Sequence, residues 1–132
     1  MILPHSGRIL VIDDRIEEAQ PLIETLSKEG YPVSYFSGNV HQLPKDPLCG
    51  IRIVFLDLKL GTDVREEKTI IGNVITVLNK VIHKENGPYL IIAWTKHPEL
   101  LDKINAKMKN KPVKIFDLNK AKCQDSGEGG KK

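Results

Sequence analysis

Five short apolar runs, separated by segments with helical periodicity, constrain the fold of this chain more than any other feature. The runs are Arg8–Ile12, Tyr31–Phe36, Ile51–Leu56, Tyr89–Trp94 and Val113–Leu118. Four of them are nearly continuous in apolar residues, which is typical of parallel strands covered on both faces. The second contains Pro32 and Ser34 and suits an edge strand. Strands that alternate with helices predict parallel βαβ units with right-handed crossovers.

The first intervening segment has an apolar face that runs from Ile16 to Leu26, and Gly30 provides a stop signal. Pro21 interrupts this segment, so the regular helix either begins near it or bends there. The stretch Glu66 to Lys84 is the clearest helix, with an apolar stripe of isoleucine, leucine and valine.

Turn and cap signals mark the remaining boundaries. Asn86-Gly87-Pro88 ends the long helix, and Pro98 occupies the first position of another helix. The stretch Ser37 to Pro47 contains two prolines and allows only a short helix.

These elements predict an α/β fold with a flavodoxin-like, doubly wound, five-stranded parallel sheet in the order 2-1-3-4-5. Such a sheet usually has a final helix over its last strand. The sequence after Leu118 offers no clear candidate, so we expect the last helix to be missing or atypical. The chain of 132 residues fits one domain at 1–120, and the hydrophilic stretch 121–132 is expected to be a flexible tail or the start of a linker.

Composition narrows the class of protein. No apolar run approaches the length of a membrane span, and the first residues lack the apolar core of a signal peptide, which favours the cytoplasm and excludes a membrane partner. The two cysteines, Cys49 and Cys123, have no metal-like spacing and are expected to be free thiols. Residues 96–132 carry 10 lysines against 5 acids. Apart from Phe116, no arginine or aromatic residue lies among these lysines, so a solvated surface is favoured over a nucleic-acid site.

Acidic residues follow two of the predicted strands. Asp13 and Asp14 follow the first apolar run, and Asp57 follows the third. In the predicted strand order these two strands are neighbours, so the three carboxylates converge at the edge where such folds bind ligands. Thr95 follows the fourth strand and brings a hydroxyl to the same edge, and Lys120 lies past the fifth.

Converging carboxylates favour a bound cation. Two carboxylates about 4 Å apart repel by roughly 4 kcal/mol at an effective dielectric constant near 20. A set of oxygen ligands favours Mg²⁺, Mn²⁺ or Ca²⁺, and Mg²⁺ commonly shares its coordination sphere with phosphate oxygens. An aspartate beside such an ion can attack phosphorus and form an acyl phosphate. Taken singly, Asp14 and Thr95 are also compatible with helix caps.

Three segments together resemble the receiver domain of response regulators in two-component phosphorelays. They are Arg8–Asp14, the run Phe55-Leu56-Asp57-Leu58-Lys59-Leu60, and Ile91–Thr95. The resemblance implies that Asp57 is the phosphoacceptor and that Asp13, Asp14, Asp57 and the backbone carbonyl of Lys59 bind Mg²⁺. It also implies that Thr95 is the switch hydroxyl, with Lys120 as the phosphate-binding lysine.

The resemblance further implies a phosphoprotein in signal transduction. Its partners would be a histidine kinase or phosphotransfer protein and a downstream effector or further domain, with a homodimer as one open assembly. The domain would phosphorylate itself from a donor rather than turn over a substrate.

Two alternatives stay open at this point. Lys96 follows Thr95, and Lys120 is not followed by proline, which favours a receiver-like interaction module that works without phosphorylation. A phosphatase of the haloacid-dehalogenase type also uses an aspartate after an apolar strand. That family needs a second acid two residues later, where this chain has Lys59, so it ranks last.

Overall fold

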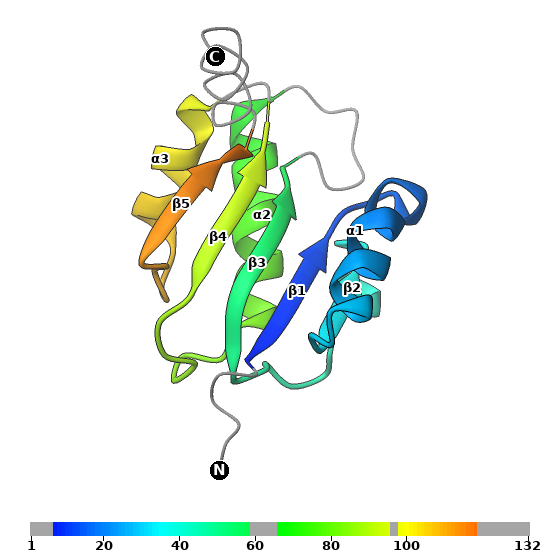
Figure 1. The fold of residues 1–132 in the computed structure, drawn as a ribbon. Coiled ribbons are helices and arrows are strands. Elements are labelled where there is room, and N and C mark those ends of the chain that lie inside the picture. The colour runs from blue at the N-terminus through cyan, green and yellow to red at the C-terminus, as the bar shows by residue number, and fades with distance from the viewer. Residues whose placement is uncertain (1–6, 59–65, 96–97, 119–132) are drawn as a thin grey trace, which may run out of the picture.

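Strands and helices alternate along the chain as the apolar runs predict (Figure 1). The computed structural model describes residues 7–58, 66–95 and 98–118. The elements are β1 (Arg8–Ile12), α1 (Ile16–Lys28), β2 (Val33–Phe36), the 3-10 turn η2 (Val40–Gln42), β3 (Ile51–Asp57), α2 (Glu67–Val81), β4 (Leu90–Trp94), α3 (Glu99–Lys107) and β5 (Lys114–Asp117).

The five strands form one parallel sheet in the order β2-β1-β3-β4-β5. This confirms the predicted fold class, and it places the strand with Pro32 before it at an edge. Ile12 on β1 lies opposite Leu56 on β3, and Asp57 lies opposite Trp94 on β4. Because all strands run in the same direction, the residues after β1, β3 and β4 meet at one edge of the sheet.

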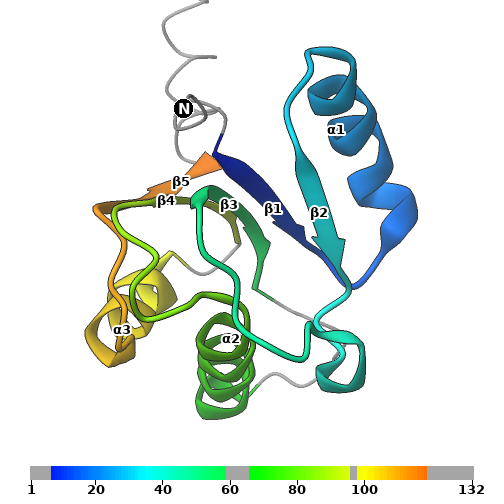
Figure 2. The same ribbon diagram turned by 90° about the horizontal axis from the view of Figure 1, so that it is seen from below.

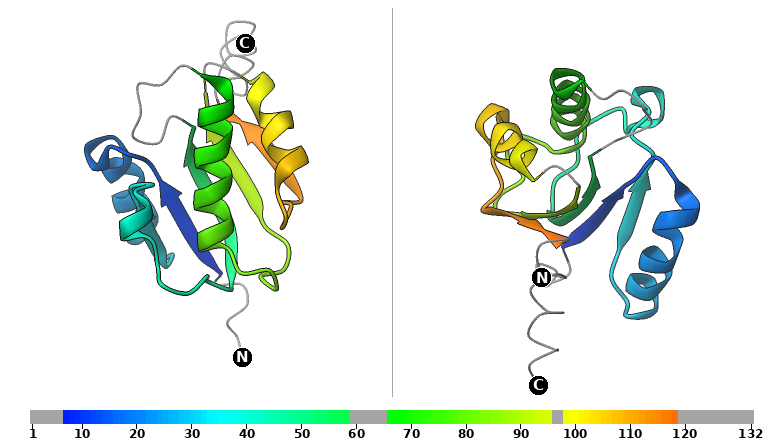
Figure 3. Two further views of the ribbon diagram at one scale, coloured as in Figure 1. Left: turned by 180° about the vertical axis from the view of Figure 1, so that it is seen from behind. Right: turned by 90° about the horizontal axis from the view of Figure 1, so that it is seen from above.

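Helices α2 and α3 cover one face of the sheet, and α1 lies on the other face (Figures 2 and 3). The main core lies under α2 and α3, where alternate residues of the central strands point. Fully buried members include Leu10, Val54, Val74 and Ile91. Within the described residues, no helix is long and apolar enough to cross a membrane.

Helices α2 and α3 begin within a residue of the predicted starts, whereas α2 ends at Val81, three residues before the predicted Lys84. Gly30 follows α1 with a φ of +89°, the left-handed conformation that favours glycine at a helix stop. Helix α1 begins at Ile16, so Pro21 lies inside it rather than at its start. Pro98 occupies the N-cap position of α3 instead of the first helical position.

The face of the sheet that carries α1 is covered unevenly. Ile9 and Val11 on β1 are buried on this face. Farther along the sheet Ile92 on β4 is only half-buried, and Phe116 on β5 is 41% exposed. Within the described part of the chain α1 is the only helix on this face, which agrees with the expected missing or atypical last helix.

The side chain of Asn86, in the turn before β4, forms hydrogen bonds with the start of β3. Its Oδ1 accepts a hydrogen bond from the Ile51 N–H at 2.8 Å, and its Nδ2 donates to the Ile51 carbonyl at 2.9 Å. Asn86 is 3% exposed, so both bonds form away from water. The side chain therefore replaces a strand partner for Ile51 where regular pairing stops.

The connection from β2 to β3 contains a single 3-10 turn in place of a full crossover helix. The Asn39 side chain caps η2 by accepting from the His41 N–H at 2.9 Å. This agrees with the short helix allowed between Ser37 and Pro47. The turn lies on the same face of the sheet as α2 (Figure 3).

Candidate functional site

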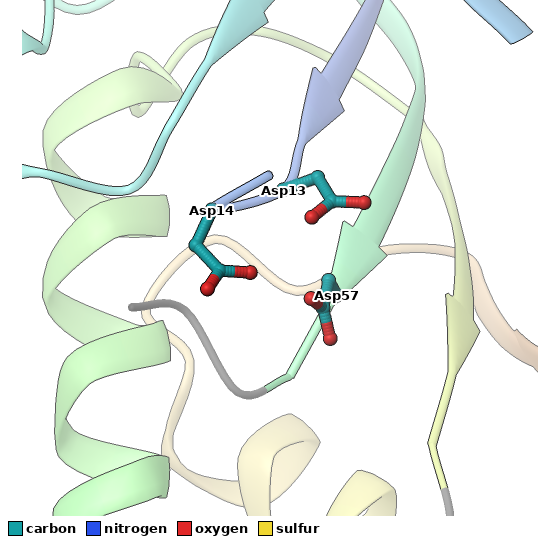
Figure 4. A group of neighbouring side chains, drawn as sticks. All are labelled: Asp13, Asp14 and Asp57. Carbon is teal, nitrogen blue, oxygen red and sulfur yellow. The ribbon is translucent and has the colours of Figure 1, made fainter. Parts of the chain in front are cut away.

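Asp13, Asp14 and Asp57 meet beyond the ends of β1 and β3, as their positions in the sequence predict (Figure 4). Each offers a carboxylate oxygen, and these oxygens all lie within 4.8 Å of one another. Asp13 is fully buried, whereas Asp14 and Asp57 are half-buried. Asp13 directly follows β1, and Asp14 lies at the bend before α1.

The two oxygens of the Asp13 carboxylate have different environments. Oδ1 accepts a hydrogen bond from the Arg15 N–H at 2.9 Å, at the start of α1. Oδ2 is buried and has no hydrogen-bond partner among the described residues. An unsatisfied carboxylate oxygen is costly in a buried place. It is also the atom expected to coordinate a cation, and the three-acid oxygen set suits a hard divalent cation such as Mg²⁺.

The hydrogen bond to Arg15 also bears on the helix-cap interpretation of Asp14. Arg15 is the N-cap residue of α1, and its own side chain makes no capping bond. The carboxylate that accepts from this helix start belongs to Asp13 rather than to Asp14. The two residues therefore differ: both contribute to the cluster, and Asp13 also accepts a hydrogen bond from the backbone of the turn (Figure 4).

Burial raises the pKa of Asp13 above its usual range, because the charged form loses hydration. The Arg15 N–H opposes this change, and the negative charges of Asp14 and Glu18 add to it. The ionised form of the Asp13 carboxylate is thus destabilised by its surroundings. A bound cation would remove that penalty.

The raised pKa predicts how stability depends on pH in the absence of divalent cations. Between the ordinary pKa of aspartate, about 4, and the higher folded-state pKa, the folded protein binds more protons than the unfolded chain. The contribution of Asp13 to the free energy of unfolding therefore falls as pH rises through this window. Urea unfolding of wild type and Asp13→Asn in EDTA, from pH 4 to 7, is expected to show wild type losing stability relative to the variant. A constant difference would contradict this expectation.

Tyr35 on β2 supports the acidic cluster. Its hydroxyl donates to the backbone carbonyl of Asp13 at 2.5 Å. Burial raises the pKa of Tyr35, and the charges of Asp13 and Asp14 raise it further, so the phenol stays protonated as a donor. The sequence analysis did not identify Tyr35. Its partner, Asp13, lies 22 residues earlier in the sequence, so no local pattern links the two.

Thr95 follows β4 directly, and Trp94 before it lies opposite Asp57 in the sheet. The strand register therefore brings the Thr95 position to the same edge as the acids. Thr95 and Trp94 are both half-buried. The other two predicted site residues, Lys59 and Lys120, lie outside the described residues.

No protein-family model matches the sequence, and no curated protein matches it significantly. Solved structures do match. A response regulator from Burkholderia pseudomallei, determined with a phosphorylated aspartic acid, a calcium ion and citrate, has a TM-score of 0.56 over 84% of this chain at 17% identity. An adenylate cyclase from Rhodopirellula baltica has a TM-score of 0.50 over 85% of this chain, also at 17% identity.

The strand order and the similarity to the response regulator agree. The chain has the receiver-domain fold. It spans 59% of the response-regulator chain and 76% of the cyclase chain. A response regulator receiver domain from Clostridium thermocellum matches more loosely, with a TM-score of 0.41, 18% identity, and coverage of 84% of this chain and 81% of its own. At these identities the comparisons show the fold, and the chemistry rests on this chain's own residues.

Proposed function

We propose that this receiver fold accepts a phosphoryl group on Asp57 with the help of Mg²⁺, and that the modified site changes a surface read by a signalling partner. The observation that carries the proposal is the three-carboxylate cluster with the buried, unpartnered Oδ2 of Asp13. Asp13, Asp14, Asp57 and the backbone carbonyl of Lys59 would hold the ion. Bound there, Mg²⁺ would offset the negative charge that otherwise repels an incoming phosphate.

Asp57 is the proposed nucleophile because it ends β3 at the centre of the sheet and is half-buried rather than enclosed. A carboxylate oxygen of Asp57 would form a bond to phosphorus while the bond from phosphorus to the donor's leaving group breaks, which produces an acyl phosphate. Thr95 would donate its hydroxyl to a phosphoryl oxygen. Lys120 would supply a positive charge to the phosphoryl group.

A histidine kinase or phosphotransfer protein is the proposed donor, and the output is a downstream effector or a further domain. Such donors act in the cytoplasm, so the proposal places the domain there. Asp57 itself is modified once in each round of phosphorylation. This is the behaviour of a signalling domain rather than of an enzyme that turns over a substrate. The similarity of the fold to the Burkholderia response regulator supports this choice.

Incubation with acetyl phosphate and Mg²⁺ is expected to add the mass of one phosphoryl group to wild type. The Asp57→Asn variant is expected to stay at background, because an amide is a poor nucleophile toward phosphorus. The measurement is intact-protein mass spectrometry. Asp46→Asn is a matched control, since Asp46 is exposed in the loop before β3.

Three results would contradict parts of the proposal. One is wild type that stays unmodified with Mg²⁺ present, which would favour an interaction module that works without phosphorylation. Another is Asp57→Asn protein that gains mass as wild type does. Retained labelling in EDTA would contradict the role of the cation.

A further inference from the structure

A cavity of about 480 Å³ lies beside the acidic cluster, between the end of β2, the turn η2 and helix α2. Asp14 belongs both to the cluster and to the wall of this cavity. The lining residues are Asp14, Ser37, Gly38, Asn39, Val40, Asn73, Thr76 and Val77. A ligand in the cavity would therefore lie next to the proposed phosphoacceptor.

The cavity exists because the β2–β3 connection contains little regular secondary structure. A parallel crossover usually carries a helix that fills the space beside the next helix. Here the crossover carries only η2, and its fold is fixed by two side-chain hydrogen bonds. Ser37 Oγ donates to Gln42 Oε1 at 2.8 Å, and Asn39 Oδ1 accepts from the His41 N–H at 2.9 Å. The wall of the cavity formed by η2 is therefore held in place without a ligand.

The charge of the cavity selects for a cation. Among the described residues that line it, Asp14 is the only charged one, and it lies within the cluster that also contains Asp13 and Asp57. The three carboxylates carry one more negative charge than a divalent ion neutralises, and Asp14 places part of that charge in the cavity wall. The described wall therefore favours a cationic group.

The neutral lining residues suit a guanidinium group on an aliphatic stem. Asn73 and Thr76 are exposed, lie three residues apart on α2, and offer an amide oxygen and a hydroxyl oxygen as acceptors. Val40 and Val77 supply apolar walls. An arginine side chain combines five donors with an apolar stem, so its head matches the oxygens and its stem matches the valines.

We propose that this cavity receives an arginine side chain of the protein that donates the phosphoryl group to Asp57. The inference rests on the proposed function, because it names a docking contact for that reaction. Since the cavity and the cluster share Asp14, the arginine would hold the donor next to the acceptor carboxylate. It would also contribute to recognition of the correct donor by a charge-assisted hydrogen bond.

The cavity can be tested without phosphoryl transfer, using N-acetyl-arginine amide as the probe and the neutral isostere N-acetyl-citrulline amide as its control. With saturating Mg²⁺, NMR signals of the Asn73 side-chain amide and the Thr76 methyl group are expected to shift saturably with the arginine probe. Because the hydrogen bonds to Asp14 are charge-assisted, citrulline is expected to bind about tenfold more weakly. Equal shifts with both probes, or no shift at these groups, would overturn the proposal.

Thr76→Lys places a competing cation in the cavity and is expected to weaken the arginine probe about tenfold. Thr76 is exposed and lysine is a good helix former, so the variant should fold. Thr25→Lys on α1 makes the same change on an exposed helical position outside the cavity, and it should bind as wild type does. Unchanged binding in Thr76→Lys, or displacement of the probe by Mg²⁺, would place the arginine elsewhere and overturn the proposal.

Transfer from a phosphohistidine peptide that carries a neighbouring arginine completes the test. At low peptide concentration, wild type should be labelled faster by this peptide than by the same peptide with citrulline, and equal rates would overturn the proposal. Wild-type labelling by acetyl phosphate, which has no arginine, reports separately on Asp57. Failure of that labelling would refute the phosphoacceptor function, whereas failure limited to the arginine comparison would refute the docking contact.

Discussion

Replacing Asp13 with asparagine is expected to weaken Mg²⁺ binding by about 100-fold, a loss at the upper end of what removing one well-placed group costs a metal site. Asp13 is fully buried, and within the part of the chain that the structure describes its Oδ2 has no hydrogen-bond partner. The variant keeps an oxygen at this position but loses the negative charge. Trp94 is the only tryptophan in the sequence and lies opposite Asp57, so its fluorescence should report the titration.

The same substitution should act in the opposite direction on the metal-free protein. Without Mg²⁺ the buried charge of Asp13 opposes folding, so Asp13→Asn is expected to be more stable than wild type at pH 7. With Mg²⁺ at about 100 times its dissociation constant, wild type should gain about 2.7 kcal/mol through binding to the folded state, and the variant should gain much less. Urea unfolding with and without Mg²⁺ measures both quantities.

Asp46→Asn provides the control for these measurements, because Asp46 is an exposed acid away from the cluster. It should bind Mg²⁺ as wild type does. Equal Mg²⁺ affinity in wild type and Asp13→Asn would rule out Asp13 as a ligand. A metal-free Asp13→Asn protein that is less stable than wild type would show that the bond to Arg15 outweighs the cost of the buried charge.

Asn86→Ala is expected to lower the free energy of unfolding by about 1 to 3 kcal/mol, because it leaves the buried Ile51 N–H without a partner. It also removes one of the two donors to the Ile51 carbonyl, which keeps its hydrogen bond from Arg52 Nη1. The Asn86 side chain satisfies both the N–H and the carbonyl of Ile51. The variant should unfold at a lower urea concentration with an unchanged denaturant slope. Circular dichroism during urea titration measures this change.

Asn105→Ala is the matched control, since Asn105 is exposed near the end of α3 and alanine is favourable in a helix. A change within about 0.5 kcal/mol is expected there, as for most surface substitutions. If both variants lose the same stability, the paired hydrogen bonds of Asn86 are not the cause. Asn86→Asp offers a stricter comparison, because a carboxylate can accept from the Ile51 N–H but cannot donate to its carbonyl.

Most of the fold could be predicted from the sequence because the apolar runs are strong and alternate with segments of helical periodicity. The limits of β1 agree with the prediction, and the sheet order and edge position of β2 follow from parallel crossovers. The start of β2 differs: Tyr31 was expected in the strand but is exposed, and pairing begins at Val33. Proline before a strand suppresses regular pairing there, which explains the shift.

The sequence predicted which site residues converge. It did not predict how deeply each one is buried or which hydrogen bonds it makes. Asp13 and Asp14 look equivalent in the sequence, whereas only Asp13 is buried and holds the start of α1. Tyr35 and Asn86 escaped notice because their partners, Asp13 and Ile51, are far away in the sequence. Such contacts depend on the packed sheet, so local patterns carry little information about them.

The placement of the acids on inner strands has a consequence for hydrogen exchange. Strand β1 pairs with β2 and β3, and β3 pairs with β1 and β4, whereas β2 and β5 are edges. Amides of inner strands exchange only when large parts of a protein open, whereas edge strands can open alone. The backbone that carries Asp13 and Asp57 should therefore keep its geometry while the edge strands open locally. Any response to modification of Asp57 would then arise in the surrounding loops and edge strands, around a carboxylate pair that stays fixed.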